Sequence, residues 1–156
     1  MKNKTVIVAR IKQLAKTLNY DYDNIEFLVQ AMNREPIENS DFANQSLATL
    51  GDSVLGLAVT ERLFKEGFGK EEITNRKKEI VDNKSLFDIS ERLQIYKNYY
   101  NSDGKFYDEV KGRNRIHHSA HDDSVEAVIG AIYLDKGFEY AKEWTIKFLR
   151  SQGEKI

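Results

Sequence analysis

The stretch that decides the fold is Asn44-Gln45-Ser46-Leu47-Ala48-Thr49-Leu50-Gly51-Asp52-Ser53-Val54-Leu55, which we interpret as part of a long helix. Apolar residues recur every three or four positions from Phe42 to about Phe64. The predicted inner face carries Leu47, Leu50, Val54, Leu57 and Ala58. At roughly 100° per residue, Gln45 and Asp52 fall within about 20° of each other on one face. Asp52 stands among apolar neighbours, where a free carboxylate is costly to bury unless it is paired or bound to a cation. An exposed aspartate beside a packing glycine is the alternative, and the spacing alone leaves it open.

The rest of the chain shows the same helical spacing, and no segment shows convincing strand alternation. A polar loop with the single proline separates the second predicted helix from the long one. We therefore predict an all-α fold, with one domain over residues 1–156 and a frayed tail at 151–156. The predicted helices cover about residues 7–18, 25–32, 42–64, 71–81, 84–93, 119–134 and 138–149.

Length, charge and composition exclude several classes of protein. A chain of 156 residues is typical of one domain, and 40% hydrophobic residues are too many for a disordered protein. Lys plus Arg total 24 against 25 for Asp plus Glu, so any contact with nucleic acid must come from a local basic patch. The absence of cysteine excludes disulfides, thiolate metal sites and thiol nucleophiles. No stretch is apolar enough for a membrane span or a signal peptide, so we expect a cytoplasmic protein.

A second acidic cluster, Asp122-Asp123-Ser124-Val125-Glu126, precedes an apolar run. Asp123 and Glu126 are neighbours on a helix surface, because residues three apart lie on adjacent turns. Capping of a helix N-terminus is one explanation, since the helix dipole favours negative charge there. Close carboxylates also repel each other, and a divalent cation would offset that repulsion. Oxygen ligands of this kind suit Mg²⁺, with Mn²⁺ as a substitute.

The two acidic segments together resemble the two signature helices of the ribonuclease III family, metal-dependent endonucleases of double-stranded RNA. The first matches a block N-x-x-L-x-x-L-G-D-S-V-L and the second a block D-x-x-E-A-x-I-G-A-I-Y-L-D. Residues 72–86 are similar to the helices that connect these blocks in the family. The resemblance covers most of residues 25–150.

The resemblance implies a fold, an activity and a set of site residues. Asp52, Asp123 and Glu126 fall on the family's catalytic carboxylates, which hold Mg²⁺. The implied activity is hydrolysis of double-stranded RNA by a metal-activated water. The implied assembly is a homodimer with one site per subunit, the two sites cutting opposite strands. A separate double-stranded RNA-binding domain, which many members carry after the nuclease domain, is not expected here.

Three positions depart from the family pattern. Ala48 stands where the family usually has a metal-binding glutamate, and Gln45 where it usually has an acid associated with RNA and dimer contacts. Gln45 is then expected to contribute through a bound water. Thr49 replaces an aromatic residue that enters the partner subunit. The alternative hypothesis is therefore a catalytically impaired relative that binds double-stranded RNA or belongs to a ribonucleoprotein.

Basic and histidine residues just before the second cluster offer further candidates. Lys111, Arg113 and Arg115 are predicted to contact RNA phosphates and 2′-hydroxyls, although a solvated loop would have the same composition. His121-Asp122 is similar to the His-Asp pair of helical metal phosphohydrolases. That class needs ligands spread over several helices, whereas the three histidines here fall within residues 117–121.

Overall fold

The molecule is built almost entirely from helices. The computed structural model describes residues 3–107 and 118–156, and within these ranges it contains isolated β-bridges but no strand. The prediction of an all-α fold is confirmed. The elements are α1 (Lys4–Thr17), α2 (Glu26–Ala31), η1 (Glu38–Ser40), α3 (Gln45–Lys65), α4 (Lys70–Val81), α5 (Asn83–Leu93), η2 (Ile95–Asn98), α6 (His118–Lys136) and α7 (Phe138–Ser151).

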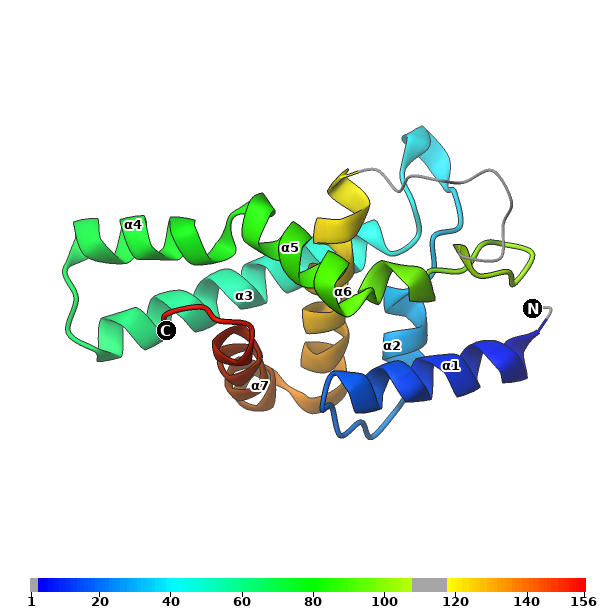
Figure 1. Ribbon diagram of the computed structural model, residues 1–156, viewed down its shortest axis with the longest axis horizontal. Coiled ribbons are helices and arrows are strands. Elements are labelled where there is room, and N and C mark those ends of the chain that lie inside the picture. The colour runs from blue at the N-terminus through cyan, green and yellow to red at the C-terminus, as the bar shows by residue number, and fades with distance from the viewer. Residues whose placement is uncertain (1–2, 108–117) are drawn as a thin grey trace.

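The long helix α3 differs from its prediction in two respects. It begins at Gln45 rather than Phe42, because Phe42 forms an antiparallel bridge with Pro36 and its N–H is accepted by the Gln45 side chain. The prediction that Leu57 lies on the inner face is wrong, since Leu57 is 54% exposed. The second half of α3 runs beside α4 as a hairpin directed away from the centre (Figure 1), and there α4 and α7 pack on α3 while Leu57 faces solvent.

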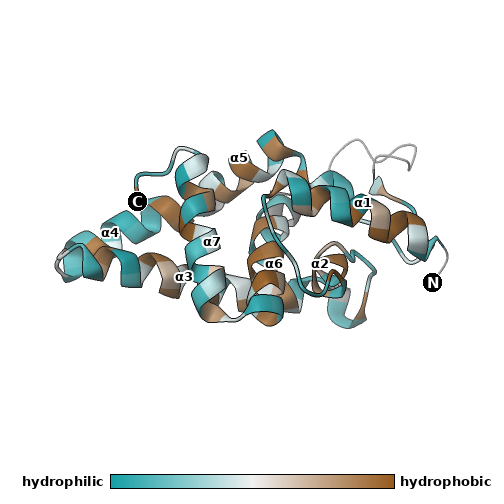
Figure 2. Ribbon diagram, turned by 90° about the horizontal axis from the view of Figure 1, so that it is seen from below, coloured by the Kyte–Doolittle hydropathy of each residue, from teal (hydrophilic) through white to brown (hydrophobic). Residues whose placement is uncertain are grey.

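Helix α6 forms the centre of the core. It contacts α2, α3, α5 and α7, and Figure 1 shows it passing through the middle of the molecule. Figure 2 shows hydrophobic residues concentrated on α6, whereas α4 is mainly hydrophilic. A helix that is apolar on most of its surface requires neighbours on several sides. Its buried apolar residues are Val125, Ala127, Val128, Ile129, Ala131 and Ile132.

Two glycines allow α3 and α6 to cross with their backbones in contact. A methyl group at Gly51 would place its carbon 1.6 Å from the backbone oxygen of Glu126. At Gly130 the corresponding carbon would lie 2.4 Å from the backbone oxygen of Leu47. Both separations are far below any van der Waals contact, so a side chain at either position would force the helices apart.

Replacing Gly51 by alanine is therefore expected to destabilise the fold. Alanine at a helix position normally gains about 1 kcal/mol over glycine, but overlap with a backbone atom cannot be relieved by a side-chain rotation. We expect Gly51→Ala to lower the free energy of unfolding in urea by about 2 kcal/mol or more. Gly56→Ala on the same helix is the matched control, because the added methyl would meet the flexible end of Lys77 at 3.5 Å. Equal stability of the two variants would contradict the close crossing.

A carboxylate at the far end of α6 holds the connection between α1 and α2. Asp135 accepts hydrogen bonds from the backbone N–H groups of Asp23 (2.9 Å) and Asn24 (2.8 Å), and from the hydroxyl of Tyr20. Burial and this carboxylate raise the pKa of the Tyr20 hydroxyl, so Tyr20 remains a donor. The final acid of the second signature block therefore organises the N-terminal segment of the chain.

Asp135→Asn should lower the free energy of unfolding by about 1–3 kcal/mol. The NH2 group of the amide would replace one accepting oxygen, so a donor would face the N–H and O–H groups that now donate to Asp135. Thermal or urea denaturation measures this loss. Asp23→Asn is the control: the Asp23 side chain is 71% exposed and pairs with Lys136, so its removal should cost at most about 1 kcal/mol. A similar loss in both variants would rule out a special role for Asp135.

The last residues of the described chain contact α5 and α7. Arg92 donates from Nη2 to the side-chain oxygen of Gln152 at 2.8 Å, and Arg150 donates from Nε to the backbone oxygen of Ile156 at 2.9 Å. Ile156 packs against the core. In the described ranges no helix has the length and apolar character needed to cross a lipid bilayer.

Candidate active site

A pocket of about 450 Å³ lies where the loop before α3, the first turns of α3 and the first half of α6 meet. It brings together residues from the two stretches that the sequence analysis singled out. The pocket is lined by Ile37, Asp41, Phe42, Gln45, Ser46, Ala48, Thr49, Asp123 and Glu126. Asp52 is not among the lining residues; it is exposed on the same helix one turn beyond Ala48.

Asp123 is held on one oxygen by two donors. Its Oδ2 accepts from Nη1 of Arg34 at 3.1 Å and from Nε2 of Gln45 at 3.3 Å. The Gln45 amide is itself oriented, because its oxygen accepts from the backbone N–H of Phe42 at 2.8 Å. Gln45 thus contacts an acid directly through a donor, which an ionised carboxylate at this position could not do.

Glu126 experiences the negative charge of the whole cluster. Burial, followed by the charges of Asp52, Asp123 and Asp122, raises its pKa from 4.5 to about 8. The influence of Asp52 on Glu126 follows from the crossing described above, since Gly51 adjoins the backbone of Glu126. Glu126 is therefore influenced by both other acids that the sequence analysis proposed, by Asp52 across the crossing of α3 and α6 and by Asp123 on its own helix.

This shift makes the stability of the cation-free protein dependent on pH. Between about pH 4.5 and pH 8 the folded state binds more protons at Glu126 than the unfolded state does, so the free energy of unfolding falls as the pH rises. The contribution is complete below about pH 4.5 and is lost as the pH passes through about 8. Glu126→Gln should remove it, so the stability of the variant relative to the wild type should increase from acidic to alkaline pH. Urea denaturation with a chelator present measures the difference, and a constant difference across this range would contradict the shift.

Sequence reasoning missed two residues of the site, Arg34 and Asn44. Arg34 is 4% exposed although it lies in the connection between α2 and α3, where no periodicity marks it. Its Nη1 also donates to the Asn44 side-chain oxygen at 3.0 Å, and Asn44 donates from Nδ2 to the backbone oxygen of Ala31 at 3.0 Å. Asn44 opens the first signature block, which is the one signal that could have pointed to it.

The donor chemistry of the pocket fits a hard divalent cation, because carboxylate oxygens gather where their mutual repulsion is unfavourable. Within residues 3–107 and 118–156, however, no three acidic, histidine or cysteine side chains lie close enough to hold one ion. Mg²⁺ commonly binds through one or two carboxylates, keeps several waters and takes a substrate phosphate. The arrangement therefore fits an ion with few ligands from the chain better than a closed three-carboxylate centre. Ala48 contributes no oxygen.

The remaining candidates lie outside the pocket or outside the described residues. Lys111, Arg113 and Arg115 belong to the part of the chain that the structure does not describe. The ring of His121 is buried, 4.6 Å from that of Phe87 and 4.3 Å from that of Tyr96 between centroids.

Comparison with known proteins identifies the family. The model of the family described as Ribonuclease-III-like matches residues 25–152, which include both signature blocks and every pocket residue. The chain therefore belongs to the Ribonuclease-III-like family. This membership sets aside the alternative of a helical metal phosphohydrolase that His121-Asp122 suggested.

Individual relatives agree with this assignment. The chain is 36% identical over 142 residues to Ribonuclease 3 of Clostridium acetobutylicum, covering 88% of this chain and 60% of that protein. It is 31% identical over 150 residues to Ribonuclease 3 of Nitratiruptor sp., covering 94% and 64%. The chain thus spans about 60% of the length of the curated relatives it matches.

Two solved structures with a similar fold are nuclease domains. Two structures of the nuclease domain of ribonuclease III from Campylobacter jejuni align with TM-scores of 0.75 and 0.74 at 28% identity. They cover 92% and 100% of this chain, and 98% and 99% of theirs. One of them is described by the structural flexibility of a region involved in dimer formation.

Proposed function

We propose that the protein is a Mg²⁺-dependent endoribonuclease that cleaves double-stranded RNA as a homodimer with one site per subunit. The observation that carries this proposal is the convergence of Asp123 and Glu126 on one pocket, with the charge of Asp52 acting on Glu126. Membership of a family whose relatives are named Ribonuclease 3 supports the reaction class. A cytoplasmic location, with access to RNA, accompanies this proposal.

Of the three predicted ligands, Asp123 and Glu126 line the pocket and would hold the ion, completed by water and an RNA phosphate oxygen. Asp52 lies outside the lining and would contribute its negative charge. When bound, Mg²⁺ supplies a water of lowered pKa as the nucleophile and a positive charge at the leaving oxygen. Asp123 presents a carboxylate fixed by Arg34 and Gln45. With its pKa raised to about 8, Glu126 holds a proton near neutral pH until positive charge approaches, so we expect it to release that proton as the site fills.

RNA and a second copy of the chain are the proposed partners. Lys111, Arg113 and Arg115 precede α6 in the sequence and are proposed to contact phosphates close to the acids. Apolar side chains on the outer face of α3, Leu57 at 54% and Phe64 at 71% exposure, are proposed to contribute to the surface between subunits. The known dimer formation of the C. jejuni nuclease domain supports this assembly.

A second candidate function is favoured by one specific observation. Ala48 lines the pocket beside Asp123 and Glu126, at the position where the family resemblance leads us to expect a glutamate. The chain would then be an RNA-binding relative with impaired catalysis. In that case duplex RNA would bind without Mg²⁺, and binding would weaken as salt increases.

Cleavage of a long duplex RNA distinguishes the two candidates. We expect the wild type with Mg²⁺ or Mn²⁺ to produce short duplexes, and Asp52→Asn and Glu126→Gln each to lower the rate by about a hundredfold or more, because a carboxylate of the site loses its charge. Asp103→Asn, in an exposed turn, is the control for loss of one negative charge. Cleavage that both site variants retain would refute the proposal.

Ala48→Glu tests the second candidate directly. If the site lacks only this ligand, the added carboxylate should create cleavage in a protein that binds duplex RNA but does not cut it. The pocket beside Ala48 has room for the longer side chain. A wild-type protein that already cleaves efficiently would exclude the non-catalytic candidate.

A further inference from the structure

We propose that Arg34 is a positioning residue of this site: it fixes one oxygen of Asp123, so that the other oxygen faces the contents of the pocket. This inference rests on the proposed function for its catalytic consequence. The contact between the two side chains can be tested without it.

The backbone of Arg34 is anchored independently of the site. Its N–H donates to the backbone oxygen of Tyr100 at 3.0 Å, and the N–H of Tyr100 donates to that of Met32 at 3.1 Å. Asn33 and Tyr100 form a parallel bridge between these segments. The side chain therefore starts from a fixed point between two parts of the chain that are distant in sequence.

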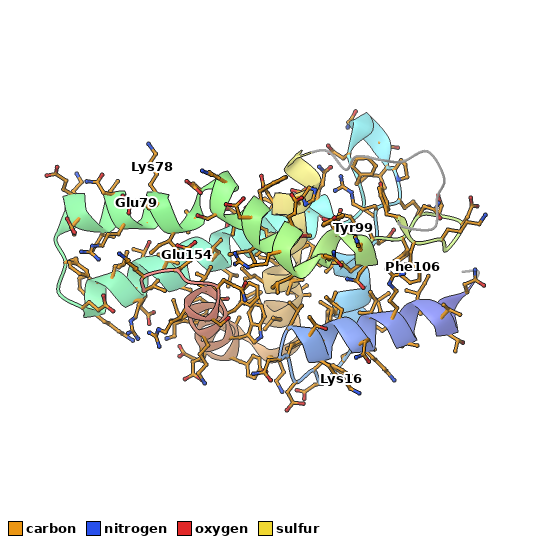
Figure 3. The ribbon with its side chains drawn as sticks, viewed as in Figure 1. Lys16, Lys78, Glu79, Tyr99, Phe106 and Glu154 are labelled. Carbon is orange, nitrogen blue, oxygen red and sulfur yellow. The ribbon has the colours of Figure 1, made fainter. Side chains whose placement is uncertain are left out.

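Aromatic rings and an amide fix the direction of the guanidinium group. Its central carbon lies 3.9 Å from the centroid of the Phe42 ring and 5.2 Å from that of Tyr99. Tyr99, labelled in Figure 3, is fully buried. Nη1 is shared between Asn44 at 3.0 Å and Asp123 at 3.1 Å. A planar guanidinium stacked on aromatic rings loses little conformational freedom when it forms these hydrogen bonds. The compact ammonium group of a lysine could not stack in this way.

The consequence for Asp123 is an asymmetric carboxylate. Both of its donors, Arg34 and Gln45, bind the same oxygen, Oδ2. In the described part of the chain, Oδ1 accepts no hydrogen bond that would turn it away from the pocket. The Asp123 side chain is 17% exposed, while that of Arg34 is 3% exposed. Arg34 is buried and does not line the pocket, whereas Asp123 does, so in this proposal Oδ1 is the oxygen left for the ligand.

Stability alone does not account for this arrangement. Nε of Arg34 is buried and has no hydrogen-bond partner in the described residues. An unpaired buried donor is unfavourable, and buried ion pairs contribute little net stability compared with apolar residues of similar size. Fixing the orientation of a functional carboxylate explains why such a group is placed here.

The test compares Arg34→Met, which keeps the length but loses the charge, with Arg34→Lys. We expect Arg34→Met to lower kcat for duplex RNA by about tenfold or more with KM nearly unchanged, because a misplaced ligand affects the chemical step. Arg34→Lys should recover part of the loss. Arg10→Met is the matched control, because Arg10 also stacks on a ring (4.0 Å from the Phe106 centroid) and bonds a backbone oxygen, away from the pocket. Wild-type kcat in folded Arg34→Met, or an equal loss in Arg10→Met, would overturn the proposal.

A double-mutant cycle in urea denaturation tests the contact without any cleavage. If Arg34 acts on Asp123, the shift in unfolding midpoint caused by Arg34→Met should be much smaller when Asp123→Ala is already present. Additive shifts would refute the positioning role. A wild-type protein that does not cleave would refute the proposed function, and the cycle would still decide whether Arg34 holds Asp123.

Discussion

The structure depends on the close crossing of α3 and α6 at Gly51 and Gly130. At this point each helix approaches the backbone of the other, which neither could do with a side chain in place. The crossing also determines the site, because Asp52 follows Gly51 on one helix and the backbone oxygen of Glu126 lies against Gly51 on the other. The same close approach therefore determines both the packing of α3 on α6 and the geometry of the site. A residue that separated the two helices would also separate Asp52 from Glu126.

The carboxylates around the pocket repel one another, and among the described residues the guanidinium of Arg34 forms an ion pair with one of them, Asp123. Glu126 is protonated more readily than an ordinary glutamate because it is buried near other carboxylates, whereas Asp123 has the guanidinium of Arg34 beside it. Functional sites commonly contain interactions that lower stability locally, and other contacts in the fold offset part of that loss. Glu126 and Asp123 therefore differ in their surroundings although they lie on adjacent turns of α6.

Helical periodicity is sufficient to predict the fold class and nearly every helix. The signature blocks point to the pocket that Asp123 and Glu126 line, whereas Asp52 lies outside its lining. Periodicity could not show that Leu57 faces solvent, because this depends on where the partner helices end. It could not reveal Arg34 either, since its contacts with Asp123 and Asn44 span a connection and two helices. The role of Asp135 was likewise hidden, because its partners lie more than a hundred positions earlier in the chain.

The contacts of Asp123 and Asp135 join residues that are far apart in the sequence, and this affects how the chain folds. Asp123 is 89 positions from Arg34 and 78 from Gln45, while Asp135 is 115 from Tyr20. Contacts that close such long loops form late, because the entropy of loop closure must be overcome before they stabilise the chain. On the ribosome, α1 to α5 emerge before α6, which packs on α2, α3 and α5. Until α6 is synthesised, the apolar surfaces of α2, α3 and α5 that it covers are therefore exposed to solvent.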